Sequence, residues 1–193
     1  MEPSTNGHHR GRCSTGFYAV VSYVPEPLGG FLDNLRAELV RGCRLRSHVT
    51  ILPPRCLPAS PDDVAREFER RSSGLAPFDI GLGDVQLFES TRVAYLSLAQ
   101  GRAEIEDLHR RLNGGALAFQ DYFPFHPHLT IAQEIEPGHV ARLLDLAARK
   151  WRECPHGRTF SVQNLTLVRN VSPERWETVS EHVIPQATLL RTA

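Results

Sequence analysis

The stretch HPHLTI at residues 126–131 ends in the pattern histidine, apolar residue, threonine, apolar residue, and the same pattern occurs as HVTI at residues 48–51. Each copy lies in a short run of β-branched and apolar residues, which predicts a strand. Side chains alternate between the two faces of a strand, so the histidine and threonine of each copy share one face, with Cα atoms about 6.6 Å apart. Each copy therefore presents one imidazole and one hydroxyl group to the same surface.

The four side chains of this repeated pattern are His48, Thr50, His128 and Thr130. A chain of this composition contains the pattern by chance about 0.08 times, so two copies indicate a repeated structural element. If the two halves are related by a pseudo-twofold axis, both pairs can approach one bound group from opposite sides. A tetrahedral anion suits such an arrangement.

The elements around the two motifs interleave in a similar order, which predicts an α+β fold of two related lobes. We expect a bilobal pseudo-twofold fold in which two antiparallel sheets face a central cleft and the helices lie outside. Hydrophobic periodicity places its elements as follows. Strands are expected at 17–24, 78–88, 92–99, 160–169 and 178–184, besides the two motif strands, and helices at about 31–41, 61–74, 105–113 and 137–151.

Composition limits the class of protein. The chain has 193 residues, 41% of them apolar, so we expect a single domain over residues 15–193. Residues 1–14 have too few apolar side chains to offset the entropy cost of ordering, and we expect them to form a disordered tail. The formal net charge is zero, which argues against binding of a long polyanion. The four scattered cysteines and the lack of a long apolar span predict a cytoplasmic protein with reduced thiols and no membrane contact. Nothing in the sequence marks a self-complementary surface, and we expect a monomer.

Two histidines and two threonines suit phosphoryl transfer. The entering and leaving oxygens lie in line on opposite sides of phosphorus, so an acid and a base are needed at opposite apices. Because histidine titrates near neutral pH, one imidazole can accept a proton from water while the other donates one to the leaving oxygen. The threonine hydroxyls can hold the nonbridging oxygens. This scheme requires no metal and no cofactor.

The paired motifs, with FHPHLTIA around the second and FSVQNLTLVRNV near the end, resemble the 2H phosphoesterase superfamily, specifically its 2′-5′ RNA ligase-like branch of cyclic phosphodiesterases. The resemblance covers roughly residues 17–184. It implies that His48 and His128 are the catalytic pair and that Thr50 and Thr130 bind phosphate. Relatives often have arginine shortly after the second motif, where this chain has Gln133, and this weakens any expectation of ATP use or extended RNA binding.

The resemblance implies a phosphodiesterase that hydrolyses the 2′,3′-cyclic phosphate, or a 2′-5′ linkage, of a nucleotide or RNA terminus. A 2′-phosphate product is expected. The alternative is a noncatalytic protein of the same fold that binds nucleotides or RNA ends. Two titratable groups in facing motifs favour the enzyme, because binding alone does not need them.

Three further sets of residues are weaker candidates. Tyr122, Phe123 and Phe125 precede the second motif and could stack on a nucleobase, although core packing explains them at least as well. Arg55 could approach the phosphate, but a solvated loop arginine is the simpler interpretation. His126 has the same strand parity as His128 and could complete a zinc site with it and the first motif; Pro127 and the unused threonines argue against this.

Overall fold

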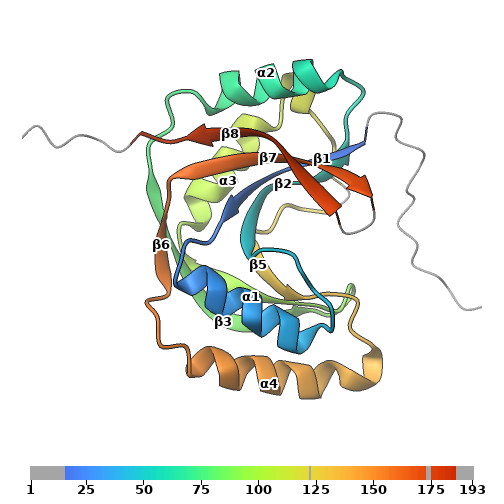
Figure 1. Ribbon diagram of the computed structural model, residues 1–193, viewed down its shortest axis with the longest axis vertical. Helices are drawn as coiled ribbons and strands as arrows, with labels where there is room; N and C mark the ends of the chain where they lie inside the picture. Colours follow the sequence, from blue (N-terminus) through green and yellow to red (C-terminus); the bar gives the residue numbers. More distant parts are fainter. Residues whose placement is uncertain (1–15, 122, 173–174, 186–193) are drawn as a thin grey trace, which may run out of the picture.

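The computed structural model describes residues 16–121, 123–172 and 175–185 (Figure 1). The expected tail at residues 1–14 and the aromatic candidate Tyr122 lie outside these ranges. The elements are β1 (Phe17–Tyr23), α1 (Leu28–Leu39), β2 (His48–Cys56), α2 (Pro61–Ser72), β3 (Phe78–Phe88), β4 (Val93–Gln100), α3 (Arg102–Leu112), η1 (Gly115–Leu117), β5 (His128–Ala132), η2 (Pro137–His139), α4 (Val140–Arg152), β6 (Thr159–Val162), β7 (Asn164–Ser172) and β8 (Arg175–Val183).

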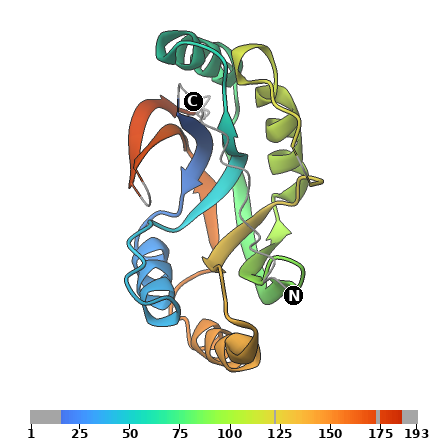
Figure 2. The same ribbon diagram turned by 90° about the vertical axis from the view of Figure 1, so that its right-hand side faces the viewer.

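The strands form two antiparallel four-stranded sheets, in the orders β2-β1-β7-β8 and β5-β4-β3-β6. The predicted α+β fold with two antiparallel sheets is therefore confirmed. Both motif strands, β2 and β5, lie at the edge of their own sheet. These two edges contact each other, so the sheets meet where the motifs lie (Figures 1 and 2).

Apolar side chains from both sheets belong to one core cluster. The motif strands contribute to it through the residues between and after their polar positions, because a strand places alternate side chains on opposite faces. Val49, Ile51, Leu129 and Ile131 are all buried. The core thus holds both motif strands in place and leaves their other faces for function.

Two helices cross from one half of the chain to the other. α1 precedes the first motif strand, yet it packs against β5 and α4, whereas α3 precedes the second motif strand and packs against β2 and α2. α2 and α4 lie at opposite ends of the molecule, α2 against β7 and β8 and α4 against β3 (Figure 1). Each motif strand is therefore supported by a helix from the other half.

Local signals placed several element boundaries correctly. The hydroxyl oxygen of Ser60 accepts a hydrogen bond from the backbone N–H of Asp63, and Pro61 occupies the first turn of α2, as the sequence predicts. β3 and β4 pair as a hairpin through the expected turn. The helix expected to open at Pro137 begins as the short 3-10 helix η2 and becomes α-helical at Val140.

One predicted strand and one prediction about the thiols are wrong. The strand expected over 160–169 is two strands, since β6 pairs with β3 in one sheet and β7 pairs with β1 in the other; Gln163 lies between them. The polar residues Gln163 and Asn164 interrupt the apolar alternation there, but they do not show that the two strands join different sheets. Cys43 and Cys154 are free, but Cys56 is disulfide-bonded, which contradicts the expectation of reduced cysteines for that residue.

None of the helices in the described ranges is long and apolar enough to cross a membrane.

Candidate active site

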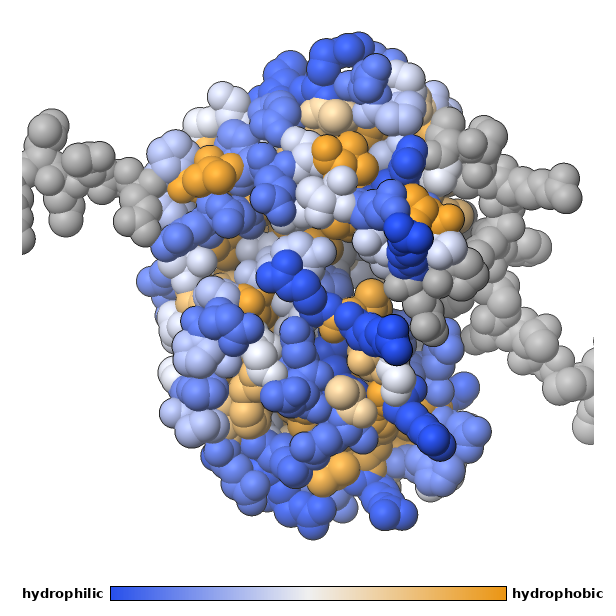
Figure 3. Space-filling model, viewed as in Figure 1, coloured by the Kyte–Doolittle hydropathy of each residue, from blue (hydrophilic) through white to orange (hydrophobic). Residues whose placement is uncertain are grey.

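The two motifs have the same pattern of exposure. His48 and Thr50 are partly exposed while the apolar residue after each is buried, and His128 and Thr130 repeat this alternation. Each pair therefore lies on one face of its strand, as strand geometry predicts. In the space-filling view, strongly hydrophilic side chains lie across the middle of the molecule, between the halves that carry α2 and α4 (Figure 3).

Both motif histidines have the same hydrogen bond at Nδ1. His48 Nδ1 lies 2.7 Å from the carbonyl oxygen of Arg46, and His128 Nδ1 lies 2.7 Å from the carbonyl oxygen of His126. A carbonyl oxygen can only accept, so Nδ1 must carry the hydrogen in each ring. In the neutral imidazole Nε2 is then the proton acceptor, as a general base requires.

His48 lies among charged and aromatic neighbours. Tyr23, its partner on β1, meets the imidazole edge to face with ring centroids 6.1 Å apart. The Arg46 guanidinium lies over the Tyr23 ring, 4.2 Å from its centroid. The pKa of His48 is lowered to about 4, mainly by burial. The positive charges of Arg36 and His128 contribute to the lowering, while the hydrogen bond to the Arg46 carbonyl and the charge of Asp33 oppose it. The imidazole is therefore neutral at pH 7 in the free protein.

His128 has mainly aromatic neighbours. Its ring meets those of Phe88 and Tyr95 edge to face, with centroids 5.0 and 5.3 Å away, and these two rings stack on each other at 4.1 Å. Burial lowers the pKa of His128, the hydrogen bond to His126 opposes this, and the charge of His126 adds to the lowering. Aromatic packing fixes the orientation of this imidazole.

The two histidines are close enough to influence each other. They start the two strands that meet between the sheets, and the charge of His128 acts on the pKa of His48. Thr50 pairs with Val21 on β1 and Thr130 pairs with Tyr95 on β4, so each hydroxyl lies beside the inner neighbour of its own sheet. The contact between β2 and β5 therefore brings two imidazoles and two hydroxyl groups to the same part of the fold.

Arg55 is not the solvated loop residue that the sequence suggested. It lies on β2, is only 1% exposed, and donates from Nη1 to Asn113 and from Nη2 to the Asp121 carboxylate at 3.1 Å. Its Nε donates to the carbonyl of Pro53. The charge is paired inside the protein, so Arg55 anchors the segment that leads to the second motif. No local signal marks this role, because its partners are about 60 residues away in the sequence.

The aromatic candidates before the second motif differ in position. Phe125 stacks on His109 with ring centroids 3.9 Å apart and packs against the core, so core packing explains it. Phe123 is 65% exposed and could contact a ligand. Stacking of a base on any of these residues stays a prediction.

The zinc alternative has no geometric support in the part of the chain that the structure describes. No group of three metal-ligating residues is assembled there. The His126 ring lies edge to face against Phe88 and Tyr95, and its centroid is 6.3 Å from that of His128. His126 instead contributes its carbonyl oxygen, which orients the second motif histidine.

Tyr23, Phe88 and Tyr95 are site neighbours that sequence reasoning missed. They belong to strands that the sequence does predict, but which strand lies beside each motif depends on sheet pairing. The alternation within the runs FYAVVSY and VAYLSLAQ could have placed each tyrosine on a defined face. It could not have placed either one next to a histidine.

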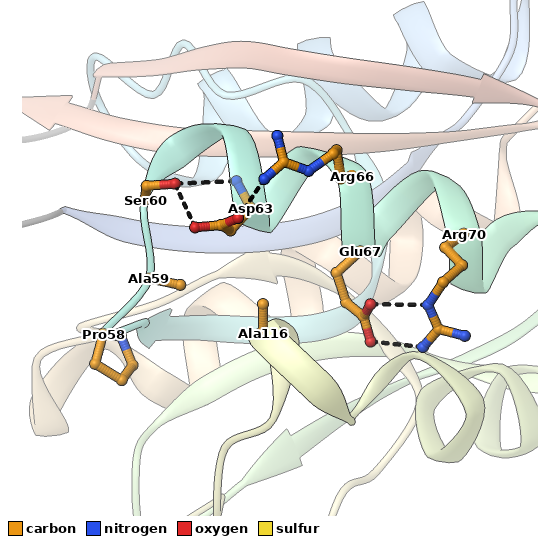
Figure 4. A pocket seen from close by; sticks show the side chains of 8 residues that line it. All are labelled: Pro58, Ala59, Ser60, Asp63, Arg66, Glu67, Arg70 and Ala116. Atoms are coloured by element: carbon orange, nitrogen blue, oxygen red, sulfur yellow. Dashed lines mark hydrogen bonds and ion pairs between the residues drawn. The ribbon is translucent and has the colours of Figure 1, made fainter.

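A surface hollow over α2 does not include these residues. Its lining comes from the segment before α2, from α2 itself and from Ala116 of η1 (Figure 4). The charges along it are paired with each other, since Glu67 binds Arg70 and Asp63 binds Arg66 and Ser60. Neither motif borders the hollow, and its paired charges leave no free group for a ligand.

Solved structures share this fold. LigT from Escherichia coli, in its apo form, superposes with a TM-score of 0.63 and 16% identity over 89% of this chain and 98% of that chain. The protein TT0787 of Thermus thermophilus gives a TM-score of 0.62 and 19% identity, with 89% and 100% covered. LigT has also been solved with phosphate, with ATP and with 3′-AMP.

Two bacterial relatives carry names that assign them provisionally to the phosphoesterases. The protein from Geobacillus kaustophilus is 27% identical over 130 residues, which are 63% of this chain and 70% of the relative. The protein from Oceanobacillus iheyensis is 27% identical over 82 residues, 42% of this chain, and the match spans about half (48%) of that relative.

The family model described as the 2′-5′ RNA ligase superfamily matches residues 24–174, a span that contains both motifs. It covers most of the chain and agrees with the family resemblance of the motifs. The chain therefore belongs to the 2′-5′ RNA ligase superfamily.

Proposed function

We propose that this protein is a phosphodiesterase that hydrolyses the 2′,3′-cyclic phosphate, or a 2′-5′ linkage, of a nucleotide or RNA terminus. Membership of the 2′-5′ RNA ligase superfamily, the LigT-like fold and the phosphoesterase names of two relatives support a phosphoesterase. Phosphate and 3′-AMP bind LigT, which supports a nucleotide ligand here.

The observation that carries the proposal is the matched pair of histidines on contacting edge strands. In each ring the Nδ1 hydrogen is committed to a backbone carbonyl, which leaves Nε2 for the substrate. One imidazole takes a proton from the attacking water, the other gives a proton to the leaving ribose oxygen, and the phosphodiester opens to a monoester. We expect the 2′-phosphate as product.

Thr50 and Thr130 would hold the nonbridging oxygens of the phosphate. Each hydroxyl shares a strand face with its histidine, two residues away, so a phosphate that reaches Nε2 is also within range of the hydroxyl. Hydrogen bonds to a charged oxygen are stronger than those between neutral groups, and they strengthen further as charge gathers in the transition state.

The experiment is turnover of 2′,3′-cyclic AMP in the presence of EDTA, with the position of the phosphate in the product determined. The protein with both His48→Ala and His128→Ala is the control. EDTA-resistant hydrolysis that disappears in the control supports a metal-independent two-histidine enzyme. Nucleotide binding without turnover would favour the noncatalytic alternative.

The single-domain boundary at residue 15, the cytoplasmic location and the monomeric state stay predictions. Limited proteolysis tests the boundary and sedimentation tests the monomer. A Cys56 disulfide that persists in protein isolated from cells under alkylating conditions would contradict the cytoplasmic location, because disulfides persist mainly in oxidising compartments.

A further inference from the structure

Each motif strand has an open edge whose carbonyl groups the sheet does not satisfy. Within the described residues, β2 pairs with β1 alone and β5 pairs with β4 alone. On an antiparallel edge strand, alternate residues direct their carbonyl groups away from the sheet. A buried carbonyl without a donor costs roughly 1–3 kcal/mol, so the partners of these outward groups matter for the position of each strand.

The partners are basic side chains from the opposite half of the chain. Arg36 on α1 donates from Nη1 to the carbonyl oxygen of Thr130 on β5 at 2.7 Å. His109 on α3 places Nδ1 2.7 Å from the carbonyl oxygen of Ile51 on β2, and this nitrogen must donate because the carbonyl accepts. Arg36 is 5% exposed and His109 is 8% exposed.

The two contacts are reciprocal. The helix before the first motif holds the strand of the second motif, and the helix before the second motif holds the strand of the first. The contacted carbonyls belong to a motif threonine in one case and to the residue after a motif threonine in the other. Both bonds therefore act within two to three residues of a motif histidine.

Arg36 is an unusual residue to bury for stability alone. No carboxylate forms an ion pair with it among the described residues, its Nε has no hydrogen-bond partner there, and its Nη2 meets only the sulfur of Cys43 at 3.8 Å. Burial of a charge without an opposite charge is costly. The bond to Thr130 is thus its main anchor, and a role in the site explains why the cost is tolerated.

His109 fixes the approach to the second motif as well. Phe125, three residues before His128, lies flat on its ring at an interplanar angle of 9°. Its Nε2 faces the Asp121 carboxylate at 3.4 Å. One side chain therefore contacts β2, the loop before β5 and the acid that pairs with Arg55.

We propose that Arg36 and His109 are positioning residues that together set the separation of the two motif histidines. The proposal rests on the proposed function for its catalytic consequence, because in-line transfer needs the acid and the base on opposite sides of one phosphorus. Displacement by as little as about 1 Å in such an arrangement can cost on the order of 10²-fold in rate. We call the two hydrogen bonds, from Arg36 to Thr130 and from His109 to Ile51, the brace. Its effect on the distance between the histidines can be tested without turnover.

The first measurement is the pKa of His48, followed by NMR, with and without His128→Gln. The groups that face His48 are Arg36 and Asp33 from α1, Tyr23 from β1, His128 from β5 and the carbonyl of Arg46 just before β2. In the wild type, removal of His128 should raise the pKa of His48, because a repelling charge is lost. His109→Phe keeps a ring stacked on Phe125 but loses the donor. In that variant, His128→Gln should raise the pKa of His48 by less than in the wild type, because the two histidines are farther apart.

Arg36→Met and Arg36→Lys separate the effect of the hydrogen bond to Thr130 from the effect of the Arg36 charge on His48. Arg36→Met should reduce the coupling between the histidines and also raise the pKa of His48, whereas Arg36→Lys, which keeps a charge and a donor, should restore much of both. His109→Asn, which keeps a donor near the position of Nδ1, should likewise restore coupling. If His128→Gln shifts the pKa of His48 equally in the wild type, Arg36→Met and His109→Phe, the brace is overturned.

The second measurement is steady-state kinetics on 2′,3′-cyclic AMP. Arg36→Met and His109→Phe should each lower kcat by about 10- to 100-fold and change KM by less than about 3-fold, and the double variant should cost less than the product of the two. Fully additive losses would contradict a shared action on one geometry. If the wild type shows no turnover, the proposed function fails, while the coupling measurement still decides the brace.

Discussion

The two motifs, HVTI and HLTI, differ at one position, yet their histidines lie in different surroundings. His48 has charged neighbours, Arg36 and Asp33, and a pKa lowered to about 4, mainly by burial. His128 is enclosed by the rings of Phe88 and Tyr95, with a pKa lowered mainly by burial. A repeated motif thus repeats the backbone and the Nδ1 hydrogen bond but not the electrostatic environment, and the environment decides how each imidazole holds a proton.

The strongest way to test the comparison is to remove each imidazole separately. We expect His48→Ala and His128→Ala each to lower kcat/KM for 2′,3′-cyclic AMP by on the order of 10² to 10⁴, as loss of an acid or base does. The pH profiles of the single variants should lose opposite limbs, because one group must be protonated and the other neutral. Near-wild-type turnover in both variants would show that neither takes part in proton transfer; circular dichroism provides the control for folding.

Asp121→Ala should weaken the contact between β2 and the segment that leads to the second motif. It leaves the buried Arg55 guanidinium without its carboxylate, which we expect to lower the free energy of unfolding by about 3 kcal/mol. Urea unfolding measures the loss, and Asp121→Asn, which retains an oxygen acceptor, is the matched control. An unfolding free energy equal to that of the wild type would mean that the pair contributes nothing to holding this segment.

The threonines should be the most equivalent pair. Thr50→Val and Thr130→Val keep the shape of the side chain and remove one hydroxyl donor, so each should weaken binding of adenosine 2′-monophosphate by about 1–3 kcal/mol. Isothermal titration calorimetry provides the comparison. Affinities unchanged in both variants would remove the threonines from the phosphate site, and a loss in only one would show that the two halves grip the phosphate unequally.

The pH dependence of stability should sharpen the difference between the histidines. Since the folded pKa of His48 is about 4 and the ordinary value is 6.5, the unfolded chain binds the extra proton between these pH values. Stability from His48 is therefore full above pH 6.5 and falls as the pH drops toward 4. We expect the loss to be roughly 1–3 kcal/mol, and smaller in His48→Gln. If the wild type and His48→Gln lose the same free energy of unfolding between pH 7 and pH 4.5, the lowered pKa of His48 is contradicted.

Strand alternation accounts for what could be predicted of the fold and the site. It placed the motif side chains on one face, and helical periodicity placed α1 to α4 to within a few residues, because both signals are local. The single strand predicted over 160–169 is wrong because the polar residues Gln163 and Asn164 break the alternation without showing that the chain changes sheet. Arg55 was misjudged for the same reason, since its partner Asp121 is distant in the sequence.

The sequence by itself determined that two histidine-threonine pairs lie on two strands, each anchored by apolar neighbours, and that these pairs suit proton transfer at a phosphate. The tertiary structure decided that both strands are sheet edges that meet, that α1 and α3 cross to the opposite half, and that Arg36 and His109 hold the two open edges. The physical reason is the distance along the chain between the residues that interact. Side-chain periodicity depends on neighbouring residues, whereas edge pairing, burial and charge depend on contacts between residues that are far apart in the chain.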